Sequence, residues 1–425
     1  MTAALQSFSI WFGLLSKTPE FHAVLSYVVA LLPVGVMLVL LFIFCERWVE
    51  YIRAKFFLKE GSTVVEVRLP KEMMKSPLAM ETFMATLHQT GGEGSWYDKY
   101  WLGKTRPWFS LEIASIEGQI HFFIWMRKSS KTFVSTSLYA QFPGIEVHDS
   151  EDYANTVHFD AATMKAWAAE LEFTKDDAYP IKSYVDYGLD KDPKEEFKID
   201  PIAPLIELLG SIGPNQQAWV QVIVRAYKKD DHTKPGHFWK SHDKWREEAK
   251  EIVNEMMNRD EKTKALKKKD EDEKADKPIL TDSDEEIINA IERNITKFGY
   301  DVGIRLMYIA KKDNFNPAII GGMLGSWKHF NAEHLNGFKP AGEWHSKISY
   351  PWQDLGGKAS AKHSQKALAM YKRRSYFYHP HKGDSMIMSS ESLATIYHFP
   401  GAVVATPTLS RVPSKKGEAP ANLPL

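Results

Sequence analysis

An uninterrupted apolar stretch near the N-terminus constrains the fold of this chain more than any other feature. Residues 21–45 contain no Asp, Glu, Lys or Arg. As an α-helix, the segment 23–45 would be about 34 Å long, and the hydrocarbon core of a bilayer is about 30 Å thick. We therefore predict a transmembrane helix at 23–45 that contacts membrane lipid. Residues 5–15 are apolar with few polar breaks, and the segment 1–22 is predicted to be interfacial.

Charges beside this stretch predict its orientation. No charged side chain precedes Lys17, whereas a cleaved signal peptide begins with basic residues. Basic residues are concentrated after the stretch, at Arg47, Arg53, Lys55 and Lys59. Because Lys and Arg favour the cytoplasmic side of a membrane, we predict a single-pass protein of the cell (inner) membrane with a cytoplasmic C-terminal body. Residues 46–62 are predicted to be a basic connector.

The rest of the chain has the composition of a folded protein. Its 425 residues are 44% hydrophobic and 25% charged, which suits an anchor followed by two or more folded units. Lys and Arg together number 54, as do Asp and Glu, so no overall positive charge favours a nucleic acid. Cys45 is the single cysteine, which excludes an internal disulfide and a cysteine-ligated metal cluster.

A strand and helix pattern predicts the first folded unit at 63–150. Residues 63–69 alternate as in a half-buried strand, and Ser76 followed by Pro77 is typical of a helix start. Two runs rich in β-branched and aromatic residues follow at 108–114 and 119–126, then a short helix and a last strand. The order β-α-β-β-α-β predicts a ferredoxin-like, or split βαβ, unit.

A second unit of the same kind is predicted at 151–335, with looser spacing. Its strands are expected at 171–173, 218–226 and 300–310, and its helices at 202–209, 238–257 and 317–330. The last part, 336–425, is predicted to be an irregular C-terminal extension with a basic helix at 359–374. The predicted class is thus α+β: a transmembrane helix, two tandem ferredoxin-like units and an irregular C-terminal segment.

A charged insertion interrupts the second unit at 258–280. It holds many Lys, Arg, Asp and Glu residues and almost no apolar ones, so it cannot bury enough surface to fold by itself. A solvated helix extension and a disordered loop are both compatible with it. Ser283 and Glu286 then form a capping-box pattern, which predicts the start of the next helix.

Motifs for catalysis do not occur in the sequence. The glycine clusters at 91–94 and 321–325 lack the lysine of a phosphate-binding P-loop. The histidines form no H-E-x-x-H metal motif, and no G-x-S-x-G nucleophile elbow is present. We therefore predict a protein that is not an enzyme and needs no cofactor or metal. A membrane enzyme with an unfamiliar site is the least supported alternative.

Two groups of side chains could bind a partner. Aromatic residues near 96–109 alternate with cations, a combination that can stack bases or contact proteins and lipid headgroups. A basic run near 362–374 could bind nucleic acid or an acidic partner, or form a solvated helix face. The candidate residues are Trp96, Tyr97, Tyr100, Trp101, Lys104, Arg106, Lys366, Lys372, Arg373 and Arg374.

Several segments resemble a known family. They are KSPLAMETFMATLHQTGGEGSWYDKYWLGKTRPWFSLEIASIEGQIHFFIWMRK (75–128), FPGIEV (142–147), QQAWVQVIV (216–224), YDVGIRLMYIA (300–310) and the terminal string that begins ESLATIYHFPG (391–425). Together they resemble the membrane-anchored N-terminal region of TraG-like and HerA-like type IV secretion (conjugation) ATPases of candidate-phyla bacteria. In that family the terminal string leads into a RecA-like motor domain with Walker motifs, and this sequence ends at Leu425, before such a domain.

The resemblance implies a role in a secretion machine without a motor of its own. We therefore expect a non-enzymatic, membrane-anchored subunit of a type IV secretion or conjugation-like machine. Its expected partner is a P-loop ATPase supplied in trans, or the transported substrate, and a homo-oligomer is compatible with this role. The alternative is a membrane-tethered nucleic-acid-binding protein, with nucleic acid as a less favoured partner.

Overall fold

A computed structural model describes residues 18–70, 75–190, 199–229, 243–257, 280–341, 350–401 and 411–412. The chain divides into two compact units. The smaller unit contains residues 1–59 and 93–105, and the larger unit contains residues 60–92 and 106–425. Most of the predicted interfacial segment and of the charged insertion lies outside the described residues.

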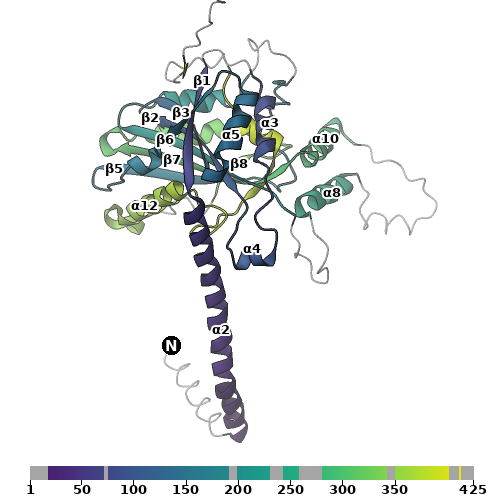
Figure 1. Ribbon diagram of the computed structural model, residues 1–425, viewed down its shortest axis with the longest axis vertical. Helices are drawn as coiled ribbons and strands as arrows, with labels where there is room; N and C mark the ends of the chain where they lie inside the picture. Colours follow the sequence, from purple (N-terminus) through teal and green to yellow (C-terminus); the bar gives the residue numbers. More distant parts are fainter. Residues whose placement is uncertain are drawn as a thin grey trace, which may run out of the picture. The chain divides into compact units, whose positions relative to one another are not determined.

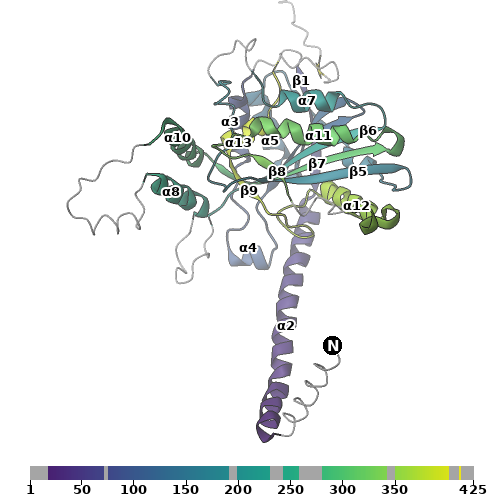
Figure 2. The same cartoon turned by 180° about the vertical axis from the view of Figure 1, so that it is seen from behind.

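The smaller unit is dominated by the long helix α2 (Pro19–Glu60), with the short helix α4 (Trp96–Tyr100) beside it (Figures 1 and 2). The part of α2 from Val29 onward is long and apolar enough to cross a membrane, and its large apolar side chains from Val29 to Phe44 are exposed. This confirms the predicted apolar helix. The helix does not end at residue 45, however: most of the predicted connector 46–62 continues α2 through Glu60.

One mixed sheet, almost entirely antiparallel, forms the centre of the larger unit. Its strands are β1 (Ser62–Pro70), β2 (Trp108–Ile116), β3 (Gln119–Arg127), β4 (Glu146–Ser150), β5 (Met164–Phe173), β6 (Gln216–Ala226), β7 (Gly299–Lys311), β8 (Phe338–Pro340), β9 (Met386–Ser389) and β10 (Arg411–Val412). The order is β10-β1-β3-β2-β6-β7-β5-β8, with β4 paired to β1 and β9 paired to β7. Among the strands of the described residues, only β1 and β10 pair in parallel.

The two predicted strand groups form a continuous sheet. Strand β2 from the first group pairs with β6 from the second, from Trp108 opposite Arg225 to Ile116 opposite Gln217. The α+β class and the strands are therefore confirmed. The two predicted units share one sheet, so the strand pairing does not confirm that they are separate. The C-terminal segment is also more regular than predicted, because it supplies β8 and β9 to the sheet.

Helices cover one face of this sheet with an apolar core. They are α3 (Pro77–Leu87), α5 (Lys131–Gln141), α7 (Ala203–Gly210), α11 (Pro317–Ser326) and α13 (Ser390–Ile396). Phe83 of α3, Leu138 of α5 and Ile206 of α7 belong to one buried cluster with strand residues such as Leu111 and Val222. Hydrophobic burial of this face is the main stabilising contribution to the fold.

The opposite face carries helix α12 (Lys358–Arg373), seen in Figure 2, and the short helix α6 (Tyr153–Thr156). Tyr153, Leu368 and Tyr371 pack there with Phe123 and Trp219. Two further helices, α8 (Lys244–Met256) and α10 (Asp282–Thr296), pack against each other through a small separate cluster. The face under α12 therefore combines apolar contacts with the polar side chains described below.

Local signals set most helix starts. Ser76 caps α3 through its side chain, with Pro77 at the first helical position, as predicted. The predicted capping box at Ser283 and Glu286 was wrong by two residues: Thr281 and Asp284 form it, and α10 begins at Asp282. Both pairs fit the same spacing, so the pattern identified the helix but not its first residue.

Two glycines provide a matched test of packing. A methyl group at Gly303 of β7 would overlap the ring of Tyr376, whose hydroxyl donates to the Asp384 carbonyl at 2.9 Å. We expect Gly303→Ala to lower the free energy of unfolding by about 3 kcal/mol, as overpacking does. Gly321→Ala, in an open position of α11, is expected to raise it by about 0.5 kcal/mol. Chemical unfolding of both variants in detergent measures the difference, and equal effects would contradict this packing.

Candidate functional site

A row of polar side chains crosses the sheet on the face under α12. Strand register aligns His148, Glu66, Phe123, Glu112, Gln221, Arg305 and Glu170 on successive strands. Residues in one such row point to the same face of a sheet. Every member except Phe123 is polar or charged. Leu111 and Val222, the sequence neighbours of Glu112 and Gln221, point to the opposite face and belong to its apolar core.

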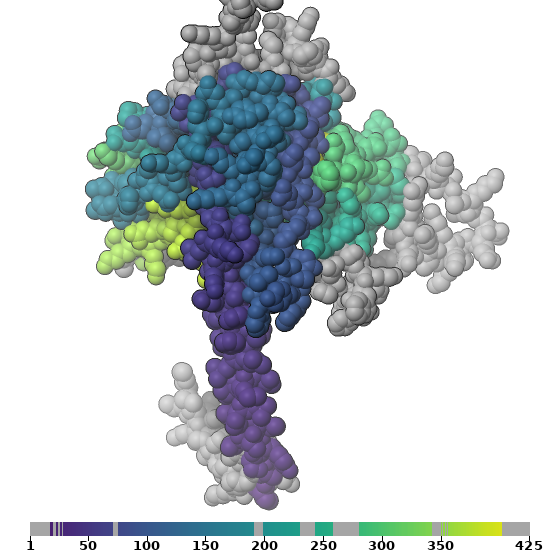
Figure 3. Space-filling model, viewed as in Figure 1, coloured from purple at the N-terminus to yellow at the C-terminus, as the bar shows by residue number. Residues whose placement is uncertain are grey.

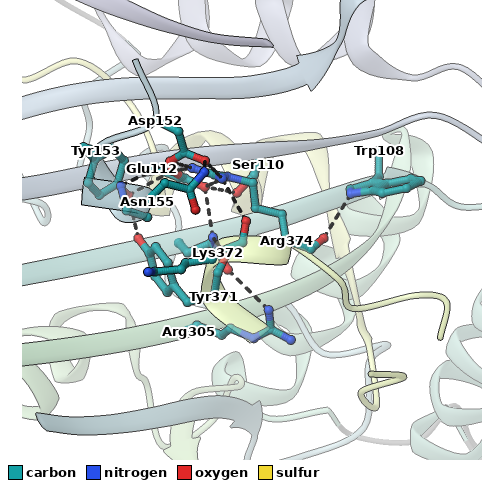
Figure 4. Close-up of polar contacts among 12 residues, drawn as sticks. Trp108, Ser110, Glu112, Asp152, Tyr153, Asn155, Arg305, Tyr371, Lys372 and Arg374 are labelled. Carbon is teal, nitrogen blue, oxygen red and sulfur yellow. Dashed lines mark hydrogen bonds and ion pairs between the residues drawn. The ribbon is translucent and has the colours of Figure 1, made fainter. Parts of the chain in front are cut away.

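The centre of the row is a buried ion pair between Glu112 and Arg374 (Figure 4). The guanidinium of Arg374 donates to both carboxylate oxygens of Glu112, at 2.8 and 3.0 Å, and to both oxygens of Asp152, at 2.6 and 2.9 Å. Glu112 and Arg374 are 0% exposed. Burial alone would lower the pKa of Arg374, but the two carboxylates and their hydrogen bonds hold it well above its ordinary value.

Glu112 is surrounded by further donors. The Ser110 hydroxyl donates to one carboxylate oxygen at 2.6 Å, and the Gln221 amide donates to the same oxygen at 2.9 Å. The Tyr153 hydroxyl donates to the other oxygen at 2.9 Å and contacts the Tyr371 hydroxyl at 2.8 Å. Burial, reinforced by the negative charge of Glu112, raises the pKa of both tyrosines well above the usual value, so both are neutral donors.

A second ion pair lies further along the row. The Arg305 guanidinium of β7 donates to Glu170 of β5 at 2.8 Å, and His381 contacts the same carboxylate oxygen at 3.2 Å. The side chains of Arg305 and Glu170 are only 3% and 6% exposed. The Arg305 guanidinium also lies over the Tyr376 ring, 5.1 Å from its centroid. This pair therefore joins two strands to the segment that follows α12.

These side chains cap the C-terminal end of α12. The last carbonyls of a helix have no partner within the helix. Here Arg305 donates to the Met370 carbonyl at 3.1 Å and to the Ser375 carbonyl at 2.7 Å, while Gln221 donates to the Tyr371 carbonyl at 3.2 Å. Cations at this end also interact favourably with the helix dipole.

Arg374 itself completes the cap. Its backbone has a positive φ of 50°, which turns the chain away from the helix axis, and its guanidinium donates to the Lys372 carbonyl at 3.0 Å. The Trp108 indole donates to the Arg374 carbonyl at 3.1 Å (Figure 4). The polar row therefore attaches α12 and the following turn to the sheet.

The geometry of the network suits a structural role rather than catalysis. Glu112 and Glu170 are each paired with an arginine and closed off from solvent. A catalytic acid or base must reach a substrate within hydrogen-bonding distance, which these carboxylates cannot do. Among the described residues, no group of three or more His, Cys, Asp or Glu side chains is arranged to hold a metal ion.

The predicted aromatic candidates lie in the smaller unit. Trp96, Tyr97 and Tyr100 belong to α4, Trp101 follows it, and all four are exposed. Lys104 forms an ion pair with Asp98 at 2.8 Å. Arg106 was assigned to this group by sequence but belongs to the larger unit, where it donates to the Ala226 carbonyl at 2.7 Å. Its side chain is mostly buried, so its inclusion in an exposed surface was wrong.

The predicted basic candidates differ in their exposure to solvent. Lys366 and Arg373 are exposed on α12, together with Lys362. Lys372 is partly buried, and its ammonium group donates to the Val157 carbonyl at 2.7 Å. Arg374 is fully buried, so it does not belong to a binding surface, and its assignment to one was wrong. The left-handed backbone at the end of the helix is what directs it inward.

Sequence reasoning missed Glu112, Gln221, Arg305 and Glu170. Each is a polar residue within a mostly apolar strand, in the segments WFSLEIA, AWVQVIV, GIRLMYIA and AWAAELEF. Polar residues in buried strands need hydrogen-bond partners. Their presence could therefore have predicted a buried polar network. The sequence contains no indication that Arg374, far away in the chain, is the partner of Glu112.

The described residues define an α+β protein with one central sheet and an N-terminal helix apolar enough to span a membrane. The chain belongs to the family described as "Domain of unknown function (DUF8128)", which matches residues 54–412. The match begins in the last turns of α2 and extends through β10. No curated protein matches the chain.

Proposed function

We propose that this protein is a non-enzymatic, membrane-anchored subunit of a type IV secretion or conjugation-like machine. Helix α2 would span the inner membrane once, and the larger unit would lie in the cytoplasm. There it would dock a separate P-loop ATPase or the transported substrate. The observation that carries the proposal is α2, whose apolar side chains are exposed over a length sufficient to cross a bilayer.

The basic residues after the apolar part of α2 support the cytoplasmic orientation. Arg47, Arg53, Lys55 and Lys59 all follow it, as expected for the inner side of a membrane. Anchoring would also raise the concentration of the larger unit near partners at the same membrane. The machine itself is inferred from the resemblance to secretion ATPases.

We also propose that the sheet consists of two ferredoxin-like halves joined edge to edge. The order β4-β1-β3-β2 in the first half and β8-β5-β7-β6 in the second supports this. Each half has a helix between its first two strands, α3 in one and α7 in the other. A split βαβ unit has its strands in this order. The paired edges would then be β2 and β6.

The exposed cations of α12 are the proposed docking surface. Lys362, Lys366 and Arg373 are exposed on a helix whose C-terminal end the buried network attaches to the sheet. A rigid element reduces the ordering cost of binding. The same three cations are the observation that favours the second candidate, a membrane-tethered nucleic-acid-binding protein.

Affinity capture tests the proposal. Tagged full-length protein is purified from detergent-solubilised membranes, and co-purifying proteins are identified. We expect a P-loop ATPase, which should be lost in Lys362→Glu/Lys366→Glu/Arg373→Glu. The control Lys311→Glu/Lys312→Glu/Lys328→Glu reverses three exposed charges elsewhere and should retain it.

Other results would contradict the proposal. Recovery of the intact chain in the supernatant after membranes are pelleted would exclude the anchor. Capture without an ATPase, combined with DNA binding that weakens steeply with salt and is lost in the α12 variant, would favour the nucleic-acid alternative. Cross-linking of the purified protein would test for a homo-oligomer.

A further inference from the structure

The segment 93–105 of the smaller unit exposes an unusual group of aromatic side chains. Trp96 is 70% exposed, Trp101 is 56% exposed and Tyr97 is 53% exposed, with Tyr100 and Leu102 also exposed. None of the residues of α4 is buried. Single exposed apolar residues are common on protein surfaces, but contiguous groups mark an interaction site.

The segment is internally braced and therefore has a defined shape. The Ser95 hydroxyl caps α4 by accepting from the Asp98 amide at 3.1 Å. The Lys104 amide donates to the Asp98 carbonyl at 2.9 Å, and the two side chains form an ion pair. These contacts close the loop, and its aromatic side chains remain exposed to solvent.

The loop packs directly on α2, just beyond its apolar part. The Trp48 indole donates to the Tyr100 carbonyl at 3.1 Å, and the Trp48 and Trp101 rings lie 5.8 Å apart. Gly103 has a positive φ of 64°, and a Cβ there would lie 2.5 Å from the Ile52 carbonyl. In Figure 3 the atoms of this segment lie against those of α2. Close backbone contact therefore fixes the loop to one position along the helix.

That position corresponds to the headgroup layer if α2 spans a membrane. The charge-free stretch ends at Cys45, and Trp48 and Ile52 follow it by about 5 and 10 Å of helix rise. The headgroup region adds roughly 5–8 Å on each side of the hydrocarbon core. Trp and Tyr are enriched at this depth because an apolar ring and a polar edge both find suitable surroundings.

We propose that the loop 93–105 is a second membrane contact, which inserts Trp96, Tyr97 and Trp101 at the headgroup–acyl boundary of the leaflet where α2 emerges. The inference rests on the proposed anchoring by α2. The ligand is the phospholipid surface itself. Lys99 of the loop and Arg53 and Lys55 of α2 add positive charge, which favours anionic lipid, whereas Arg47 is paired with Glu50 at 2.7 Å.

Three labelled positions test the depth of the loop. In a Cys45→Ser background, full-length protein carries one new cysteine, Leu40→Cys, Tyr97→Cys or Leu58→Cys, labelled with a polarity-sensitive fluorophore. All three native side chains are exposed, so the changes should not disturb packing. The proteins are reconstituted in vesicles of phosphatidylcholine and phosphatidylglycerol that contain nitroxide-labelled lipid.

The proposal predicts a distinct result at each position. The label at 40 should be quenched by nitroxide in the acyl chains, and the label at 97 by nitroxide at the headgroup. The label at 58, about 20 Å of helix beyond Cys45, should be quenched only by aqueous iodide. Trp96→Ser/Trp101→Ser should reduce lipid quenching at 97, whereas the control Leu58→Ser/Ile199→Ser, at two other exposed apolar positions, should not.

Different results would overturn the anchoring by α2 and the second membrane contact by the loop 93–105. A label at 40 that stays accessible to iodide would overturn the anchoring and this inference together. A label at 40 within the bilayer and a label at 97 open to iodide would overturn the second contact alone. A label at 97 shielded from both iodide and lipid nitroxide would indicate a protein contact and would also overturn it.

Discussion

Arg374→Met is expected to lower the free energy of unfolding by about 3–5 kcal/mol, because it leaves a buried carboxylate without its cation. Glu112 is 0% exposed and its two oxygens both accept from this guanidinium. The hydrogen bonds from Ser110, Gln221 and Tyr153 would persist. They supply neutral donors and do not replace the positive charge.

Chemical unfolding of the full-length protein in detergent, followed by tryptophan fluorescence, measures this loss. The matched control is Arg68→Met, since Arg68 pairs with Glu66 at 3.1 Å but its side chain is 48% exposed. Exposed ion pairs contribute at most about 1 kcal/mol. The double variant Glu112→Leu/Arg374→Met should be less destabilised than the sum of the single variants. An Arg374→Met variant as stable as Arg68→Met would show that the buried pair does not hold α12.

Asp177→Asn is expected to stabilise the protein at neutral pH. Burial raises the pKa of Asp177 to about 7 from an ordinary value of 3.8, reinforced by the nearby negative charge of Glu248. The carboxyl ionises in the unfolded chain at a lower pH than in the folded chain. Folding is therefore penalised progressively from about pH 4, and fully above about pH 7.

An asparagine removes this penalty and can still accept the hydrogen bond from the Ile387 amide. Three pKa units correspond to about 4 kcal/mol, and partial exposure of Asp177 reduces the expected gain to about 2 kcal/mol. Unfolding of both proteins at pH 4 and pH 8 measures it, with Asp313→Asn, at an exposed position, as the control. A gain of equal size at both pH values would exclude ionisation as the cause.

Periodicity predicted most of the elements of this fold but not how the strands pair. Alternation in segments such as 63–69 shows which side chains face the core, since successive residues point to opposite faces. It does not show which strand lies next to β2. Segment 218–226 is apolar on both faces, which indicates a strand covered on both sides. The sequence does not show that β2 pairs along its edge, because that pairing depends on tertiary packing.

The polar site was the least predictable part. Lys372, Arg373 and Arg374 are consecutive basic residues, yet one is partly buried, one exposed and one fully buried. Helix geometry separates the first two, and the positive φ at Arg374 redirects the third. A sequence pattern shows the charge of such residues, whereas their environment depends on Glu112 and Asp152, which lie more than 200 residues earlier.

The edge-to-edge pairing of β2 with β6 affects how the larger unit can be divided. Cutting the chain near residue 160 would leave each fragment with an uncovered, mostly apolar strand edge, Trp108–Ile116 in one and Gln216–Ala226 in the other. Such edges promote aggregation. Each fragment would therefore be insoluble or would self-associate through these strands. Mixing the two should restore solubility by re-forming the β2–β6 ladder together with the Glu112–Arg374 pair.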